Sequence, residues 1–184
     1  RAETDRISGL VDDLFELSRI NAGALQVTLH TVPLSDVVSD AVAAAAPVAE
    51  AKRVRLYAQP SGYGLVRGSE PELGRVLANL LLNAIRHTPS DGVVRVDGGS
   101  DATGGWVTVT DECGGIPESD LPRVFDVAFR GAAARSPDPD PAPRGGGGLG
   151  LAIVRGLVDL HGGDVSVANA AAGCRFTVRL PAGL

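Results

Sequence analysis

The segment from residue 70 to residue 87 constrains the fold most, because its apolar residues repeat with the period of an α-helix. At about 100° per residue, one face of this helix collects six of them: Leu73, Val76, Leu77, Leu80, Leu81 and Ala84. Such a face has to be covered by a sheet or by other helices. Asn79, Asn83 and Arg86 fall together at its edge, and His87 lies just beyond.

The segments around this helix predict alternating helices and strands. Further helices are expected at residues 1–21, from about 34 to 52, and 149–161. Strands are expected at residues 25–30, 53–58, 92–99 and 104–112, a turn plus a short strand at 62–68, and a closing hairpin at 164–180. This order predicts an α/β sandwich, in which one mixed sheet carries helices on one face.

Composition excludes several classes of protein. A net charge of −5 argues against a nucleic-acid or anionic-membrane binder, which needs a basic surface. No apolar run reaches the roughly 18 residues that a transmembrane helix needs. Cys113 and Cys174 are the only cysteines, too few for a disulfide framework or a metal cluster, so a reducing compartment is expected. Because the chain has no methionine, it is expected to be part of a longer protein.

The paired asparagines are the first candidate site. Asparagine is a poor residue for a helix interior, so Asn79 and Asn83 need an explanation. In one interpretation they make hydrogen bonds within the protein. In the other, an amide oxygen ligates Mg²⁺, which takes few protein ligands when phosphates supply the rest. Arg86 would then meet a phosphate oxygen.

Two glycine-containing segments are further candidates. Asp111 lies at the end of the strand expected at 104–112, where its carboxylate can accept a hydrogen bond from the adenine amine, and Gly115 allows the backbone to approach a flat base. Turns of this composition are common, so the pattern alone does not assign the site. Residues 146–151 lead from glycines directly into a helix, which makes an anion site. They match neither the phosphate loop nor the dinucleotide fingerprint.

Taken in order, these segments resemble the catalytic, ATP-binding domain of bacterial sensor histidine kinases, in the GHKL ATPase superfamily. The family boxes are matched by "NLLLNAIRHTP" (N box), "DECGGI" (first glycine box), "RVFDVAFRG" (F box) and "GGGLGLAIV" (second glycine box). The resemblance implies a two-layer sandwich of the GHKL type, with a mixed, mostly antiparallel sheet, helices on one face and one long N-terminal helix before it.

The resemblance also implies a domain organisation. Residues 1–23 would be the second helix of the dimerisation and phosphoacceptor hairpin, and residues 24–184 the ATP-binding domain with a lid at about 131–147. Considered alone, the amphipathic helix at 1–21 either packs on its own domain or forms half of a hairpin that builds a bundle with another chain.

Individual roles follow from the matched positions. Asn83 would coordinate Mg²⁺ with support from Asn79, and Arg86 would act with Asn83 in catalysis by contacting phosphate. Asp111 would bind the adenine amine. The remaining nucleotide contacts implied are His87, Gly115, Gly146, Gly148, Leu149 and Gly150. His87 can also be read as an ordinary polar residue at a helix end. Phe125 and Phe129 match the F box, whose aromatics pack around the lid.

The implied activity is transfer of the γ-phosphoryl group of ATP to a histidine of a phosphoacceptor domain, for relay to a response regulator. The implied protein is a homodimer, with this portion on the cytoplasmic side of a membrane-anchored sensor. Two alternatives remain: a degenerate nucleotide-binding module that regulates phosphatase output, and another GHKL kinase of the anti-sigma-factor type.

The chain departs from the family pattern at three places. Cys113 stands where the first glycine box has its first glycine, so a positive φ there would weaken nucleotide binding. Glu112 is expected to add negative charge near the nucleotide. None of the histidines, His30, His87 and His161, has the sequence context of the phosphoacceptor, and His161 is interpreted as structural.

Overall fold

The computed structural model describes residues 2–59, 62–129 and 148–183. Its helices are α1 (Ala2–Asn21), α2 (Leu34–Lys52), α3 (Glu70–His87), the short 3₁₀ helix η1 (Leu121–Arg123) and α4 (Gly150–Leu160). Its strands are β1 (His30–Pro33), β2 (Arg55–Ala58), β3 (Leu65–Gly68), β4 (Val93–Asp101), β5 (Gly104–Thr110), β6 (Asp164–Asn169) and β7 (Cys174–Pro181). None of the helices in these ranges combines the length and apolarity that crossing a bilayer needs.

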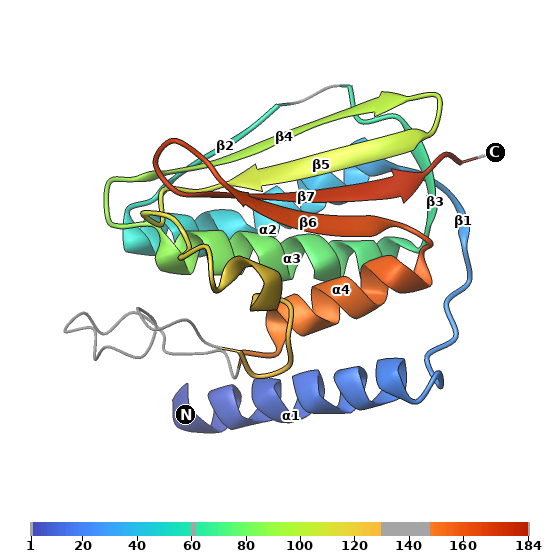
Figure 1. Cartoon of the computed structure of the whole chain (residues 1–184), viewed down its shortest axis with the longest axis horizontal. Helices are drawn as coiled ribbons and strands as arrows, with labels where there is room; N and C mark the ends of the chain where they lie inside the picture. Colours follow the sequence, from blue (N-terminus) through green and yellow to red (C-terminus); the bar gives the residue numbers. More distant parts are fainter. Residues whose placement is uncertain (1, 60–61, 130–147, 184) are drawn as a thin grey trace.

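The main sheet has five strands in the order β2-β4-β5-β7-β6. β2 and β4 run parallel, and the other neighbours are antiparallel. β1 and β3 form a separate antiparallel pair, which meets the residues after β7 through a bridge between Val66 and Ala182. The mixed, mostly antiparallel sheet expected from the sequence is therefore confirmed (Figure 1).

Helices α2, α3 and α4 cover one face of this sheet, and the core lies between the two layers (Figure 1). Alternate strand residues point into the core, as the period of a strand requires; Val107 and Val109 of β5 and Phe176 and Val178 of β7 are all buried. On α3 all six residues of the expected apolar face are buried, together with Ile85. The helix that constrained the fold from sequence is thus the central helix of the layer.

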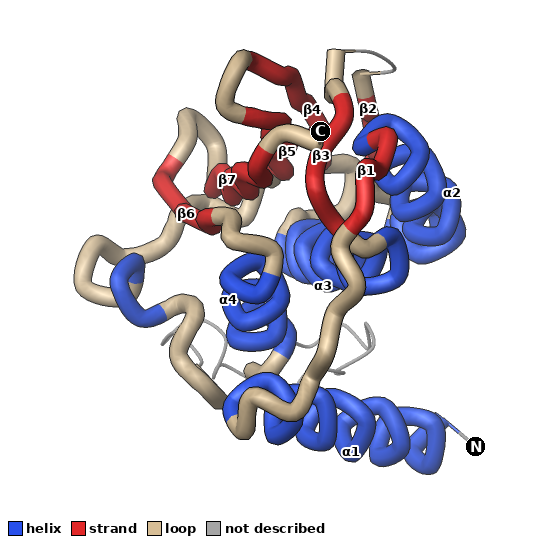
Figure 2. The backbone as a smooth tube through the Cα atoms, turned by 90° about the vertical axis from the view of Figure 1, so that its right-hand side faces the viewer, coloured by secondary structure: helices blue, strands red, loops and turns tan. Residues whose placement is uncertain are grey.

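α1 lies outside this sandwich, against α4 rather than the sheet (Figure 2). Its C-terminal half is anchored by Leu17, which is 5% exposed, and by Ile20, which lies over Gly156 of α4. Arg75 of α3 forms ion pairs with Asp13, at 3.0 Å, and with Glu16. The other side of α1 leaves four large apolar side chains exposed: Ile7, Val11, Leu14 and Phe15. The helix therefore packs on its own domain and still presents an uncovered apolar face.

One expected strand is misplaced. The sequence predicted a strand at residues 25–30, but β1 begins only at His30. The register explains the difference, because His30 pairs with the last residue of β3, Gly68. Residues 24–29 lie beyond that strand and run from α1 to the sheet without forming a ladder.

Candidate functional site

Three elements that carry the candidate residues end or begin at the same side of the molecule. α3 ends there, β5 points there, and α4 starts there, all toward the left of Figure 1. Gly150, the first residue of α4, lies against Asn79 of α3: a Cβ on Gly150 would be 3.4 Å from the Asn79 Oδ1. The backbone N–H of Glu112 donates to the Thr88 hydroxyl just after α3, at 3.4 Å. The candidate segments are thus brought together by tertiary contacts.

The asparagines of α3 are both half-buried. The Nδ2 of Asn79 is buried and has no hydrogen-bond partner among the described residues. A buried amide without a partner is costly, so it needs a group from outside the described chain. The interpretation that hydrogen bonds within the protein alone explain this asparagine therefore does not account for the Nδ2. An amide nitrogen with no hydrogen-bond partner among the described residues, beside the start of α4, fits a phosphate-bearing ligand.

Arg86 and His87 lie at the exposed end of α3. The Lys52 Nζ donates to the backbone oxygens of Ile85, at 3.1 Å, and Arg86, so a cation sits at the negative end of the helix dipole. Although the His87 ring reaches solvent, desolvation by the surrounding chain lowers its pKa, and the charges of Arg86 and Lys52 lower it further. His87 is therefore neutral at neutral pH, with one nitrogen able to donate and the other able to accept.

Asp111 is a buried carboxylate, 3% exposed. Its Oδ1 accepts two backbone N–H bonds, from Cys113 and from Cys174, each at 3.0 Å. Burial raises the Asp111 pKa, and these two bonds oppose that rise. Because Oδ1 is occupied by the backbone, Oδ2 is the oxygen that remains to accept a hydrogen bond from a ligand.

Glu112, the acidic residue after Asp111, has a backbone partner on a neighbouring strand. Its Oε2 accepts the backbone N–H of Val93, at 3.0 Å, so the carboxylate is turned toward the start of β4. The expectation that Glu112 adds negative charge near the nucleotide stays a prediction, with this backbone contact setting the direction of one carboxylate oxygen. The sequence shows that the residue is acidic, but only the packing of β4 beside β5 shows which donor it meets.

Cys113 differs from its expected behaviour in two ways. Among the described residues the positive-φ positions other than glycine are Arg53, Asp91 and Ala128, so Cys113 does not carry the left-handed strain considered from sequence. Gly114 and Gly115, with φ of 82° and 92°, take the left-handed conformation instead. Cys113 also forms a disulfide with Cys174. The two cysteines had no joint role predicted from sequence, because their approach depends on β5 pairing with β7.

The disulfide bears on metal binding as well. Ligand atoms of Asp111, Cys113 and Cys174 lie within 4.8 Å of one another. Metal ions bind thiolates, and sulfurs that are bonded to each other cannot serve in that way. In this state the three residues do not make a metal centre.

The structure describes the part of the second glycine box that leads into α4. Gly148 has a φ of 74°, and its backbone oxygen accepts the N–H of Ala128 at 3.1 Å. A Cβ on Gly148 would stand 2.9 Å from the backbone oxygen of Phe129, so only glycine fits there. Leu149 precedes α4 without a side-chain cap on the helix, which leaves the first amides of α4 available. Gly146 and the lid expected at 131–147 lie outside the described residues.

The F-box aromatics, Phe125 and Phe129, each pack against neighbouring side chains. The Phe125 ring meets the Phe176 ring of β7 edge to face, with centroids 6.1 Å apart, and the Arg155 guanidinium lies 4.8 Å from the Phe125 centroid. The Arg123 guanidinium stacks at the same distance on Phe129. Such contacts tie the segment after η1 to the sheet and to α4.

Two residues that form hydrogen bonds to the first glycine box were not predicted from the sequence. Thr88 is fully buried and receives the Glu112 N–H. Asn169, at the end of β6, pairs with the backbone of Ile116: its Oδ1 accepts and its Nδ2 donates, each at 2.8 Å. Each contact joins residues that are far apart in sequence and that come together only when the sheet folds.

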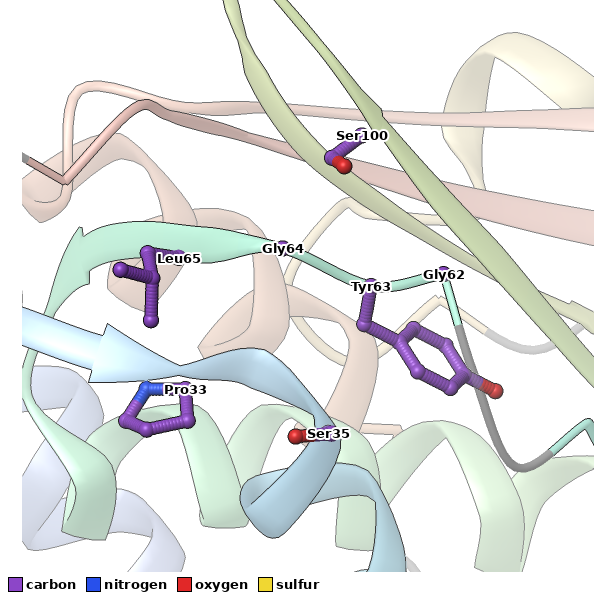
Figure 3. Close-up of a pocket in the computed structure, with 7 residues that line it drawn as sticks. All are labelled: Pro33, Ser35, Gly62, Tyr63, Gly64, Leu65 and Ser100. Carbon is purple, nitrogen blue, oxygen red and sulfur yellow. The ribbon is translucent and has the colours of Figure 1, made fainter.

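A hollow of about 430 Å³ lies away from these residues, between the start of α2 and β3 (Figure 3). Figure 3 shows Ser100 on one side of the β3 segment and Pro33 and Ser35 on the other. None of the candidate residues lines it, and its lining contains no charged side chain. It is unsuited to a polyphosphate, so it does not compete with the site described above.

Residues 68–184 match the family described as histidine kinase-, DNA gyrase B-, and HSP90-like ATPase. Across 97% of its length, the chain is 35% identical to the sensor protein SphS of Synechococcus elongatus, and it covers 44% of that protein. It is also 35% identical to the signal transduction histidine-protein kinase AfsQ2 of Streptomyces coelicolor, covering 98% of this chain and 31% of AfsQ2. The chain thus spans less than half of these relatives.

Solved structures give the same fold. Full-length ShkA in complex with AMPPNP superposes with a TM-score of 0.82 at 24% identity, covering 100% of this chain and 38% of ShkA. The mycobacterial sensor histidine kinase MprB has a TM-score of 0.68 at 28% identity, covering 84% of this chain and 100% of that one. The two-layer arrangement expected from sequence is confirmed by these likenesses.

Proposed function

Since the chain belongs to the histidine kinase-, DNA gyrase B-, and HSP90-like ATPase family, we propose that it is the ATP-binding catalytic domain of a sensor histidine kinase. It transfers the γ-phosphoryl group of ATP to a histidine of a phosphoacceptor domain. The observation that carries the proposal is the meeting of Asn79 and Gly150, which places an unpartnered buried amide beside the start of α4. The similarity to SphS and AfsQ2 over nearly all of this chain supports the kinase assignment.

The adenine end of the nucleotide lies at the first glycine box. The Asp111 Oδ2 accepts a hydrogen bond from the exocyclic amine of adenine while its Oδ1 stays bound to the backbone. Gly115, with its positive φ and no side chain, leaves room for the base. A buried acceptor at the end of β5 rejects a base with a carbonyl in place of the amine, because two acceptors would then face each other.

The phosphate end lies between α3 and α4. The amide oxygen of Asn83 ligates Mg²⁺, and the buried Asn79 amide supports the site. Bound Mg²⁺ would neutralise charge on the phosphates during transfer. Arg86 and His87 contact the phosphate chain from the end of α3. The uncapped amides at Leu149 and Gly150 complete the cradle together with Gly148, and Gly146 belongs to it by the family pattern.

The remaining partners follow from the same assignment. The phosphoacceptor domain supplies the receiving histidine, and a response regulator receives the phosphoryl group from it. α1 is the second helix of the acceptor hairpin, with the domain boundary near residue 23 and the lid at about 131–147. The exposed face formed by Ile7, Val11, Leu14 and Phe15 suits a bundle in a homodimer. The domain works on the cytoplasmic side of a membrane-anchored sensor, without nucleic acid as a partner.

Calorimetric titration with a non-hydrolysable ATP analogue, with and without Mg²⁺, tests the site. We expect Mg²⁺-dependent binding by the 184-residue chain and its loss in Asn83→Ala. Asn21→Ala is the matched control, because Asn21 ends α1 on the exposed surface. It should bind like the parent chain. No binding by a folded parent chain, or undiminished binding by Asn83→Ala, would overturn the proposed site.

A second assay tests transfer. The chain is incubated with labelled ATP and a separate hairpin domain that carries an acceptor histidine. Label on that histidine is expected. Nucleotide binding without any transfer would contradict the kinase assignment and favour a regulatory module.

A further inference from the structure

The two cysteines meet because of the sheet topology. Cys113 lies in the glycine box after β5, and Cys174 begins β7, 61 positions later. β5 and β7 are antiparallel neighbours, with Thr110 opposite Arg175 at the end of the ladder. The Cα atoms of the two cysteines are 6.4 Å apart, within the range that a disulfide spans without backbone movement.

This bond surrounds the carboxylate of Asp111. The backbone N–H groups of both cysteines donate to the Asp111 Oδ1, and the N–H of Asp111 donates to the Cys174 carbonyl at 2.9 Å. The disulfide therefore fixes the spacing of the two donors that orient the carboxylate. If that spacing changes, the direction of Oδ2 changes with it.

Besides the disulfide and the Asp111–Cys174 hydrogen bonds, further hydrogen bonds link the glycine box to the β6–β7 hairpin. The Gly114 N–H donates to the Ala172 carbonyl at 3.1 Å, and Asn169 pairs with Ile116. Gly114, Asn169 and Ala172 are exposed, so water competes for these hydrogen bonds. The covalent link is the strongest constraint between the two segments.

The two sulfurs differ in access. Cys174 is 1% exposed, whereas Cys113 is only partly buried. A reagent from solvent thus meets Cys113 first, and Cys174 is positioned to complete the exchange. When the bond is broken, the two sulfurs separate to non-bonded distance, so the covalent constraint between the glycine box and β7 is lost.

We propose that Cys113 and Cys174 form a reversible thiol–disulfide modification site that sets the affinity for nucleotide. The disulfide form holds Asp111 in the binding geometry, and the dithiol form binds less tightly because the box must be ordered when the ligand arrives. This inference rests on the proposed function of Asp111 as the adenine-binding residue.

The oxidant that forms the Cys113–Cys174 bond is a small-molecule disulfide such as oxidised glutathione. The Cys113 thiol loses its proton and attacks one sulfur, forming a mixed disulfide and releasing one small thiol. The Cys174 thiol then loses its proton and displaces the second small thiol, forming the Cys113–Cys174 bond. Two electrons and two protons pass from the protein to the reagent, which leaves as two thiols.

The test compares nucleotide affinity in the two states. The 184-residue chain is treated with oxidised glutathione or with a reductant, and intact mass after alkylation counts the free thiols. Titration with a non-hydrolysable ATP analogue and Mg²⁺ should give a dissociation constant about three- to tenfold higher for the reduced chain. Equal affinities in states verified by mass would overturn the inference, as would failure of the oxidised chain to form the disulfide.

Two variants separate the possible causes. Cys174→Ala removes the partner without touching the glycine box, and it should bind as weakly as the reduced parent in both buffers. Ser166→Ala, on an exposed position of β6, keeps both cysteines and should keep the full response. A response to reductant that persists in Cys174→Ala would overturn the inference. If a folded parent chain binds nucleotide in neither state, the proposed function fails instead.

Discussion

At the scale of single residues, the carboxylate of Asp111 combines a structural and a proposed recognition role. Oδ1 accepts two backbone N–H bonds, and an amide oxygen at the same place can accept them too. Oδ2 is the proposed acceptor for the adenine amine. In an asparagine, the NH₂ group at that position would face the adenine amine, so two donors would meet. The two roles can therefore be separated by one isosteric substitution.

We expect Asp111→Asn to fold normally and to lose at least about tenfold in nucleotide affinity, since hydrogen bonds to charged groups contribute about 1.5–3 kcal/mol. The free energy of unfolding, from urea titration, should not fall at neutral pH, because the buried charge is removed. Asp101→Asn, at the exposed last residue of β4, is the control and should bind normally. Unchanged affinity in Asp111→Asn would contradict the role of Oδ2.

The pKa of Asp111 also predicts a pH dependence. Because burial raises this pKa above the ordinary value of 3.8, Asp111 takes up a proton while exposed aspartates remain ionised. A protonated Oδ2 no longer accepts freely, so nucleotide affinity should decline on acidification before the fold is lost. The sign for stability is opposite: a raised pKa favours the folded, protonated form at low pH, and that contribution disappears as the pH rises through the folded pKa. Affinity and unfolding measured over the same pH series distinguish the two effects.

At the scale of elements, Gly148 joins the F-box segment to α4. It combines a positive φ with a backbone that leaves no room for a Cβ. Gly74, in the second turn of α3, differs in both respects, since it is not among the positive-φ glycines and a Cβ there would meet nothing within 4 Å. Replacing glycine by alanine is therefore expected to change the free energy of unfolding in opposite directions at the two positions.

Gly148→Ala should lower the free energy of unfolding by about 1–3 kcal/mol and reduce nucleotide affinity, because the start of α4 has to shift. Gly74→Ala should raise stability by about 0.5–1 kcal/mol, since alanine is the better helix former. Thermal unfolding and analogue titration of both variants provide the measurement. Equal changes of stability in both would show that the left-handed conformation at Gly148 is not required.

His161 joins two helices in a similar way. It is 2% exposed at the end of α4; its Nδ1 donates to the Leu157 carbonyl at 2.7 Å, and its Nε2 accepts the Ser69 N–H before α3 at 3.1 Å. The structural role expected from sequence agrees with these contacts. His161→Ala should lower the free energy of unfolding by about 2–4 kcal/mol, because it leaves a cavity and removes the acceptor of the Ser69 N–H, while the Leu157 carbonyl keeps the backbone N–H of residue 161.

The matched control is His30→Ala, since His30 is exposed at the start of β1. It should change stability by less than about 0.5 kcal/mol. Denaturant unfolding followed by circular dichroism gives both values. A cost at His161 as small as that at His30 would mean that water or a neighbouring group replaces the imidazole.

At the scale of the whole molecule, the disulfide closes a segment that contains the F box, the lid region, α4 and β6. Its ends are 61 positions apart in sequence. Linking them restricts the unfolded chain far more than the folded one, in which the β5–β7 ladder already brings them together.

Reduction should therefore lower the free energy of unfolding by about 4 kcal/mol, on the loop-entropy relation. For a chain of this size, that corresponds to a fall in Tm of about 10 °C. Calorimetry in oxidising and reducing buffers measures it, with the Cys113→Ala/Cys174→Ala double variant as a chain that should not respond to reductant. A parent chain with the same Tm in both buffers would contradict this prediction.

The sequence by itself determined the helices, most of the strands and the order of the boxes, because these depend on local periodicity and on glycine positions. The apolar face of α3 illustrates this, since one repeat predicts both the helix and its burial. Three features were decided by tertiary structure: the direction of the Glu112 carboxylate, the pairing of Asn169 with Ile116, and the Cys113–Cys174 bond. Each joins residues far apart in the chain, and which strand lies beside which is fixed only when the whole sheet packs against its helices.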